Sequence, residues 1–152
     1  ETAAVCLHLA DGHPQAGFAP AVGTPGRAHF YKWLAWMTNT VQATLMIYFY
    51  PERWLNEGNA AGAAELKAHA EAKVGAMLDQ MDAQIAAHGK DWFLGERFGV
   101  LDPYAFVLCR WTRGFARPAR SLPHLKPFLD RMLARPAVRR ALATEKLAEP
   151  FV

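Results

Sequence analysis

The chain has 152 residues, of which 52% are hydrophobic, 12% aromatic and 20% charged, with a formal net charge of +3. This apolar content is enough for one buried core near the most common domain size, and it excludes a disordered or low-complexity chain. The most apolar run, residues 43–50, is far shorter than the roughly 20 residues of a membrane-spanning helix, so we expect no membrane association.

Residues 1–10 predict a helix that ends at Gly12 and Pro14. Because this helical pattern is already under way at the first residue, which is not Met, we expect an upstream piece of the protein to be absent from the chain. The first residues also lack the basic and apolar segments of a signal peptide, so we expect a cytoplasmic protein. Cys6 and Cys109 lie in apolar helical patterns, where we expect buried, reduced thiols rather than a disulfide framework.

Residues 14–23 contain two prolines and two glycines and predict an extended linker. A long helix is predicted over residues 24–50, because Thr24 is a good N-cap, Pro25 suits the first turn and Pro51 stops the helix. Its apolar side chains recur every three or four residues, as in one buried face: Phe30, Trp33, Leu34, Met37, Val41, Leu45 and Tyr48.

A second long helix is predicted over residues 60–88, and only a short irregular piece separates it from the first, so we expect the two to pack as an antiparallel pair. Its apolar stripe contains Leu66, Ala70, Val74, Met77, Leu78, Met81 and Ile85. A compact loop and three shorter helices are predicted to follow, the loop over residues 90–99 and the helices over 100–115, 123–135 and 136–147. No segment shows the alternation of a strand, so the predicted class is all-α.

Basic side chains are concentrated in the C-terminal third of the chain. Residues 1–100 contain seven Lys and Arg against ten Asp and Glu, whereas residues 101–152 contain ten against four. An excess of this kind is compatible with a surface for phosphate or nucleic acid. The region lacks both a recognition-helix motif and the exposed aromatics of a single-strand binder, so we favour a solvated basic face and expect no nucleic-acid partner.

Sets of residues that would indicate a metal site or hydrolytic chemistry are missing. The six histidines are dispersed, and Glu65 with His69 is the one acidic–His pair at helical spacing worth naming. One such pair does not make a metal site, so we expect no metal. A Ser-His-Asp set, a phosphate loop and a CxxC motif are also lacking, so hydrolase, nucleotide-binding and zinc functions have no support.

Four stretches together resemble the C-terminal half of cytosolic glutathione transferases, especially the bacterial beta-like groups: residues 1–5 (ETAAV), 31–36 (YKWLAW), 95–102 (GERFGVLD) and 122–138 (LPHL to RPAV). The resemblance runs over essentially the whole chain. It implies an all-α bundle of the glutathione transferase C-terminal type, with two long antiparallel helices and three shorter ones. The implied domains are a remnant of the last helix of a thioredoxin-like domain, otherwise missing, over residues 1–12, a linker over 13–23 and the helical domain over 24–152.

The resemblance also implies roles for particular residues. Glu1 and Thr2 match the acidic and hydroxyl residues with which the family binds the γ-glutamyl end of glutathione, whose ammonium and carboxylate suit a carboxylate and a helix N-terminus. Judged without the family, they are only a polar helix start. Gly99 and Asp102 match the family's capping box, a structural motif, although Gly99 replaces the usual Ser or Thr and so removes one of its two hydrogen bonds.

Asn39, Gln42 and Trp111 are the residues that we expect in the wall of the electrophile pocket. Asn39 and Gln42 are three apart in a predicted helix, which puts them on one face. Gln42 matches a polar position, often His, of the beta-like relatives. A Gln side chain can donate and accept hydrogen bonds, but it does not act as an acid or base near neutral pH. Two plainer interpretations stay open: polar bonding between helices for Asn39 and Gln42, and a core position for Trp111.

The resemblance implies a glutathione transferase that uses glutathione as co-substrate, directs its thiolate at a small hydrophobic electrophile, and acts in detoxification as a cytoplasmic homodimer. In the family the thiol-activating Tyr, Ser or Cys lies in the thioredoxin-like domain, so no residue here is assigned as catalytic, and we expect the segment alone to be inactive. Two alternatives are a non-enzymatic binding or scaffolding member of the fold and an unrelated helical ligand-binding domain.

Overall fold

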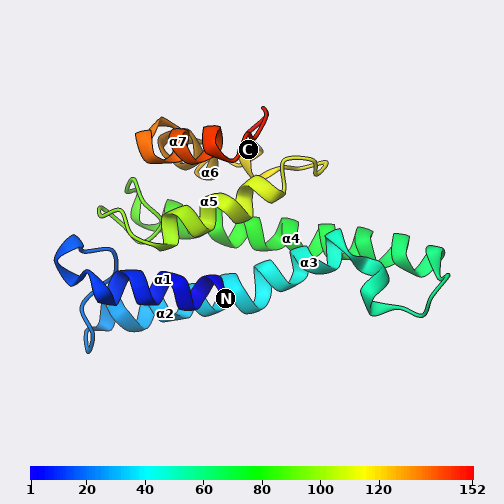
Figure 1. Cartoon of the computed structure of the whole chain (residues 1–152), viewed down its shortest axis with the longest axis horizontal. Coiled ribbons are helices and arrows are strands. Elements are labelled where there is room, and N and C mark those ends of the chain that lie inside the picture. The colour runs from blue at the N-terminus through cyan, green and yellow to red at the C-terminus, as the bar shows by residue number, and fades with distance from the viewer.

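The computed structural model describes all 152 residues as a bundle of α-helices without a β-strand, which confirms the predicted class. In Figure 1, α6 and α7 lie on the side of the bundle that faces away from α1 and α2. None of the helices combines the length and apolarity needed to cross a membrane. The α-helices are α1 (Thr2–Gly12), α2 (Pro25–Trp36), α3 (Ala43–Phe49), α4 (Ala60–His88), α5 (Leu101–Trp111), α6 (Leu125–Ala134) and α7 (Pro136–Thr144).

The first long helical rod consists of α2, a π-helical turn (Met37–Gln42) and α3. Thr24 caps it as predicted, since its Oγ1 accepts a hydrogen bond from Arg27 N at 3.3 Å, and Pro25 occupies the first turn. The predicted extent of this rod is therefore confirmed, but its middle is not α-helical. Because π-helical hydrogen bonds run from i to i+5, the turn is wider and changes which side chains share a face.

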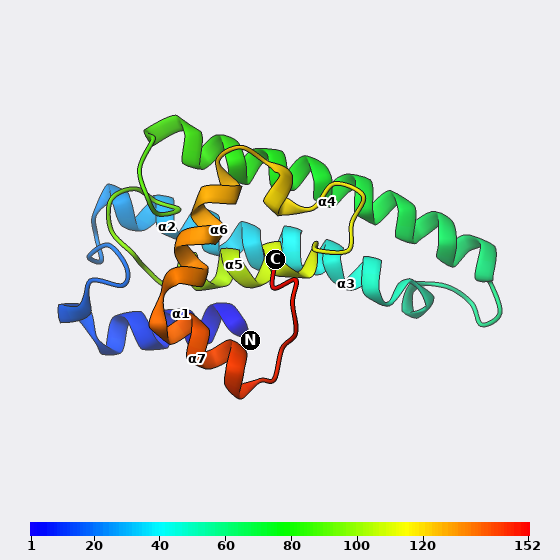
Figure 2. The same cartoon turned by 90° about the horizontal axis from the view of Figure 1, so that it is seen from above.

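The second rod is α4, which runs antiparallel to the first, as Figure 2 shows. At its start Asn59 Oδ1 accepts a hydrogen bond from Gly62 N at 2.9 Å, and at its end Gly89 adopts the left-handed conformation with a φ of 60°. The predicted antiparallel pair and both ends of the second helix are thus confirmed. Most of the predicted stripe is buried: Ala70, Val74, Met77, Leu78, Met81 and Ile85.

The helix α5 ends at Trp111, earlier than the predicted residue 115. Thr112 is fully buried, and its hydroxyl donates to Cys109 O at 2.7 Å and accepts from Ala119 N at 3.0 Å. Such bonds between a side chain and the backbone compete with continued helix. The chain therefore turns at Thr112 and brings Phe115 back into the core.

The two cysteines differ in burial, and both are free thiols. Cys109 is buried on α5, and this burial raises its pKa to about 12. Cys6, on α1, is only half-buried, so the expectation of two buried thiols is wrong for this residue. Partial burial also raises the pKa of the Cys6 thiol.

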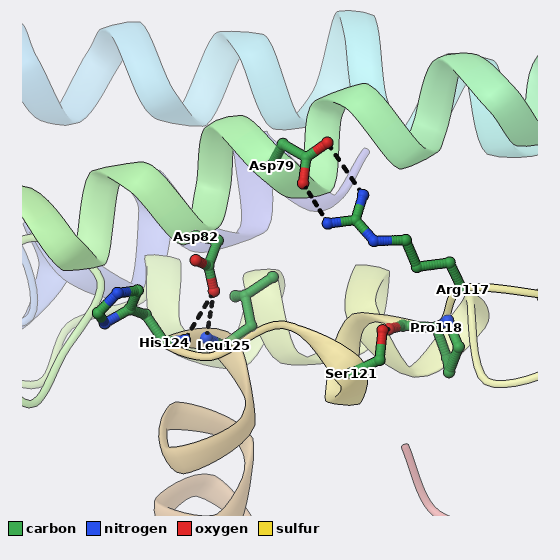
Figure 3. Close-up of polar contacts among 7 residues, drawn as sticks. All are labelled: Asp79, Asp82, Arg117, Pro118, Ser121, His124 and Leu125. Carbon is green, nitrogen blue, oxygen red and sulfur yellow. Dashed lines mark hydrogen bonds and ion pairs between the residues drawn. The ribbon is translucent and has the colours of Figure 1, made fainter.

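Two carboxylates of α4 fix the connection between α5 and α6 (Figure 3). Asp82 Oδ1 accepts hydrogen bonds from the backbone N–H groups of His124 and Leu125, both at 2.8 Å. Asp82 therefore caps the first turn of α6 from a different helix. About one turn away, Asp79 pairs with Arg117 through two hydrogen bonds of 2.6 and 3.0 Å. Part of the C-terminal basic excess is thus used inside the fold.

Candidate functional site

A polar cluster lies between the π-helical turn and α5. The Tyr104 hydroxyl is 3.0 Å from Thr38 Oγ1 and donates a hydrogen bond to Gln42 Oε1. With the Tyr104 proton directed at Gln42, Thr38 is the donor of the other bond. Because the carboxamide oxygen of Gln42 is occupied, its Nε2 retains two N–H groups for a ligand.

Tyr104 is 4% exposed, and burial raises the pKa of its phenol. The charges of Cys6 and Glu1 raise this pKa further, whereas the hydrogen bond with Thr38 lowers it. The phenol therefore stays protonated near neutral pH and remains a donor.

Asn39 does not join this cluster. Its side chain is exposed and makes no hydrogen bond, and the α-helical spacing that would align it with Gln42 does not apply in the π-helical turn. The structure brings Thr38, not Asn39, to the side of Gln42. Tyr104 is the member that sequence reasoning missed, although a Tyr on a buried helical face needs a partner for its hydroxyl, and that need was a usable signal.

An apolar hollow of about 620 Å³ lies about one helical turn along the chain from Gln42. We call it the aromatic hollow. Met46, one turn beyond Gln42, and Pro103, next to Tyr104, are both part of its wall. The other apolar residues of the wall come from α3, α5, α7 and the segments beside them: Phe49, Tyr50, Phe106, Val107, Trp111, Val138, Ala141, Leu142 and Leu147.

Trp111 is half-buried in the wall of the aromatic hollow. Its ring meets that of Phe49 edge to face, with centroids 6.2 Å apart and planes at 89°. Phe49 itself is 41% exposed. Two aromatic surfaces are therefore available at the hollow for a flat apolar ligand.

Glu1 and Thr2 stand at the start of α1, where both are exposed. Neither side chain makes a hydrogen bond, and Glu1 uses only its backbone carbonyl, which accepts from Val5 N at 3.1 Å. Both side chains and the first N–H groups of α1 are consequently free to bind an external group.

Asp102 is buried at the start of α5, with 2% of its surface exposed. Its carboxylate accepts from Gly99 N at 2.6 Å and from Phe93 N at 2.8 Å. A Cβ on Gly99 would lie 2.6 Å from the carbonyl oxygen of Phe18, which itself accepts from Val100 N at 3.0 Å. This close approach explains why Gly, and not Ser or Thr, occupies the position.

A second hollow, of about 860 Å³, lies between the linker and the loop before α5 and shares no residue with the aromatic hollow. Its buried cation, Arg27, is already engaged by Asp11 at 2.8 Å and by the Pro20 carbonyl at 3.1 Å. These bonds connect α1 and the linker to α2, so we assign Arg27 a structural role and do not take the second hollow as a ligand site. Nowhere does the chain gather three His, Cys, Asp or Glu side chains that could hold a metal ion.

Comparison with known proteins decides which family has this arrangement. The family model described as the glutathione S-transferase, C-terminal domain matches residues 36–136. The chain belongs to this family. The matched region contains the π-helical turn, α3, α4, α5 and α6, and therefore most of the candidate site.

Individual relatives agree with this family assignment. Glutathione S-transferase GstA of Escherichia coli O157:H7 is 26% identical over 147 residues, which are 97% of this chain and 68% of the relative. The solved ternary complex of BphK, a bacterial glutathione S-transferase, superposes with a TM-score of 0.81 at 27% identity. A sphingomonad glutathione S-transferase complexed with glutathione gives 0.79 at 28% identity. Each superposition covers 97% of this chain and 68% of the other, which excludes an unrelated helical domain.

Proposed function

We propose that this chain forms the helical part of a glutathione transferase, with glutathione as co-substrate and a small hydrophobic electrophile in the aromatic hollow. The observation that carries the proposal is that hydrogen-bonding Gln42, held by Tyr104, lies about one helical turn before Met46, a residue in the wall of a hollow lined by aromatic rings. Family membership and the glutathione found in the sphingomonad relative support the choice of co-substrate.

The proposed chemistry is attack of the glutathione thiolate on the bound electrophile. Gln42 contributes N–H donors that orient the reactants and favour negative charge beside them, without moving a proton. Because the chain spans 68% of the relatives that it matches, we propose that the thiol is activated by residues outside these 152 and that the segment alone is inactive.

We further propose that Glu1 and Thr2 bind the γ-glutamyl end of glutathione. Their free side chains at the start of α1, and the unpaired N–H groups of its first turn, support this assignment. Residues 1–12 then belong to a thioredoxin-like domain, 13–23 form the linker and 24–152 the helical domain. The complete protein is proposed to be a cytoplasmic homodimer that acts in detoxification.

The test is glutathione conjugation by the complete protein with 1-chloro-2,4-dinitrobenzene, combined with retention on immobilised glutathione. We expect retention and turnover, and we expect Gln42→Ala to lower kcat/KM by about tenfold, as for a lost hydrogen bond to a charged group. Tyr104→Phe should lower it less, and should have no further effect in the Gln42→Ala background, because it acts through Gln42.

Thr44→Val is the matched control, since the Thr44 hydroxyl bonds only to the Thr40 carbonyl. Retention on glutathione without turnover of any aryl halide, peroxide or disulfide would favour a non-enzymatic binding protein of the same fold. Absence of both retention and turnover would contradict the proposed function.

A further inference from the structure

Two arginines in the wall of the aromatic hollow have no acidic partner. Arg110 is 8% exposed, and Arg113 follows three residues later. Their hydrogen bonds go to backbone carbonyls, from Arg110 Nη1 to Phe151 at 2.7 Å and from Arg113 Nη1 to Arg110 at 3.2 Å. The one acidic residue of the wall, Glu145, is exposed and forms no ion pair with either arginine.

Arg110 is therefore a buried cation without an acidic partner at an apolar surface, whereas Arg113 is exposed to solvent. Burial lowers the pKa of Arg110, and the like charge of Arg113 lowers it further. A buried cation without a counter-ion is costly, because a carbonyl dipole offsets only part of its lost hydration. An anionic ligand group would remove that cost.

Arg110 also has donors available for such a group. The one buried side-chain nitrogen or oxygen without a partner in the whole chain is Arg27 Nε. The nitrogens of Arg110 that make no hydrogen bond therefore still reach solvent. A guanidinium presents its N–H groups as a planar fork, which matches the two oxygens of a carboxylate.

We propose that the aromatic hollow selects aromatic electrophiles that carry a carboxylate, with the ring against Phe49 and Trp111 and the carboxylate at Arg110 and Arg113. The inference rests on the proposed function, because it names the substrate class of that same site. A neutral electrophile would fill the same space but leave both arginines without a counter-ion.

The reaction of glutathione with a chloronitrobenzoate needs no reactant besides these two. The glutathione thiolate forms a carbon–sulfur bond at the ring carbon that bears chlorine, the carbon–chlorine bond breaks, and chloride leaves with the bonding electrons. The carboxylate takes no part in these bond changes. Arg110 and Arg113 are therefore specificity residues, and their effect belongs in KM rather than in kcat.

The experiment compares 4-chloro-3-nitrobenzoate with its methyl ester as substrates of the complete protein, each kcat/KM being divided by the uncatalysed rate with glutathione. We expect the carboxylate to be favoured about tenfold, the size of one charge-assisted hydrogen bond. Arg113→Gln should reduce this preference, because it should raise KM for the carboxylate more than KM for the ester. Arg140→Gln, the same change of charge at an exposed α7 position outside the hollow, is the control.

A second measurement separates this inference from the proposed function. Binding of 3-nitrobenzoate is measured by calorimetry with the glutathione site saturated by S-methylglutathione, and it should weaken in Arg113→Gln and at high salt. Carboxylate binding that depends on Arg113, without turnover of either substrate, would contradict the proposed function alone. Equal normalised rates for acid and ester, or a preference unchanged in Arg113→Gln, would overturn the inference and leave the proposed function standing.

Discussion

Gly99 shows how one residue departs from a family motif for a steric reason. The capping-box pattern calls for a hydroxyl at this position, but the Phe18 carbonyl occupies the space that a side chain would need. The same carbonyl accepts from Val100 N and so anchors the linker to the start of α5. The carboxylate of Asp102, which is far from Phe18 in the sequence, also stabilises this junction by accepting a hydrogen bond from Gly99 N.

We predict that Gly99→Ser destabilises the protein, although it restores the residue usual in the family. The new Cβ would lie 2.6 Å from a backbone oxygen, and the resulting shift should cost about 1–3 kcal/mol, more than the roughly 1 kcal/mol that a serine cap contributes. Urea unfolding measures the difference, with Gly114→Ala as the control because a Cβ there meets nothing within 4 Å. A Gly99→Ser variant more stable than the parent would refute this steric account.

At the scale of elements, helix ends were predictable where the capping residue is local. Thr24 and Asn59 begin their helices through bonds to residues three positions ahead, and Gly89 ends α4 by its own conformation. The end of α5 was not predictable, because Thr112 stops it partly through Ala119. The start of α6 lies at Leu125 rather than at the predicted residue 123, and its cap, Asp82, comes from α4.

The cap from Asp82 carries an energetic prediction that distinguishes it from its neighbour. Asp82→Ala should lower the free energy of unfolding by about 1–3 kcal/mol, because two N–H groups at the start of α6 lose their acceptor. Asp79→Ala should cost at most about 1 kcal/mol, because the pair with Arg117 is half-exposed on both sides. Chemical denaturation of both variants measures the contrast, and equal losses would show that Asp82 does not act as a cap.

At the scale of the whole molecule, the apolar stripes were enough to predict two antiparallel rods and one core. The site was only partly predictable. Gln42 and Trp111 were named from the sequence. Tyr104 and Arg110 were not, because the contact of Tyr104 with Gln42 and the place of Arg110 in the hollow wall depend on how α5 packs against the rest of the bundle. Local spacing also failed for Asn39, because the π-helical turn breaks the α-helical period.

The stability of the whole chain should depend on pH through Asp102. Burial raises the pKa of this carboxyl to about 6, although hydrogen bonds from Phe93 and Gly99 and the charge of Arg135 oppose the rise. The unfolded chain titrates near the ordinary value of about 3.9. The folded state thus binds the proton more tightly, and this stabilisation is complete below about pH 4 and lost as the pH rises through about 6.

Asp102→Asn should remove this component, so that the free energy of unfolding falls less between pH 4 and about 6 than in the parent protein. The measurement is urea denaturation at several pH values across that interval. Parallel curves for the two proteins would rule out Asp102 as the source.

The π-helical turn interrupts an otherwise α-helical rod at one defined place, which protein engineers could use. Met37, Val41 and Leu45 keep facing the core at successive spacings of four, while Asn39 points to solvent. A π-helical turn contains one residue more than the same length of α-helix. Deleting a single residue there would change the direction of the Gln42 side chain, while α2 and α3 keep their packing positions. Substrate scope could then be redesigned by changing chain length rather than by exchanging side chains.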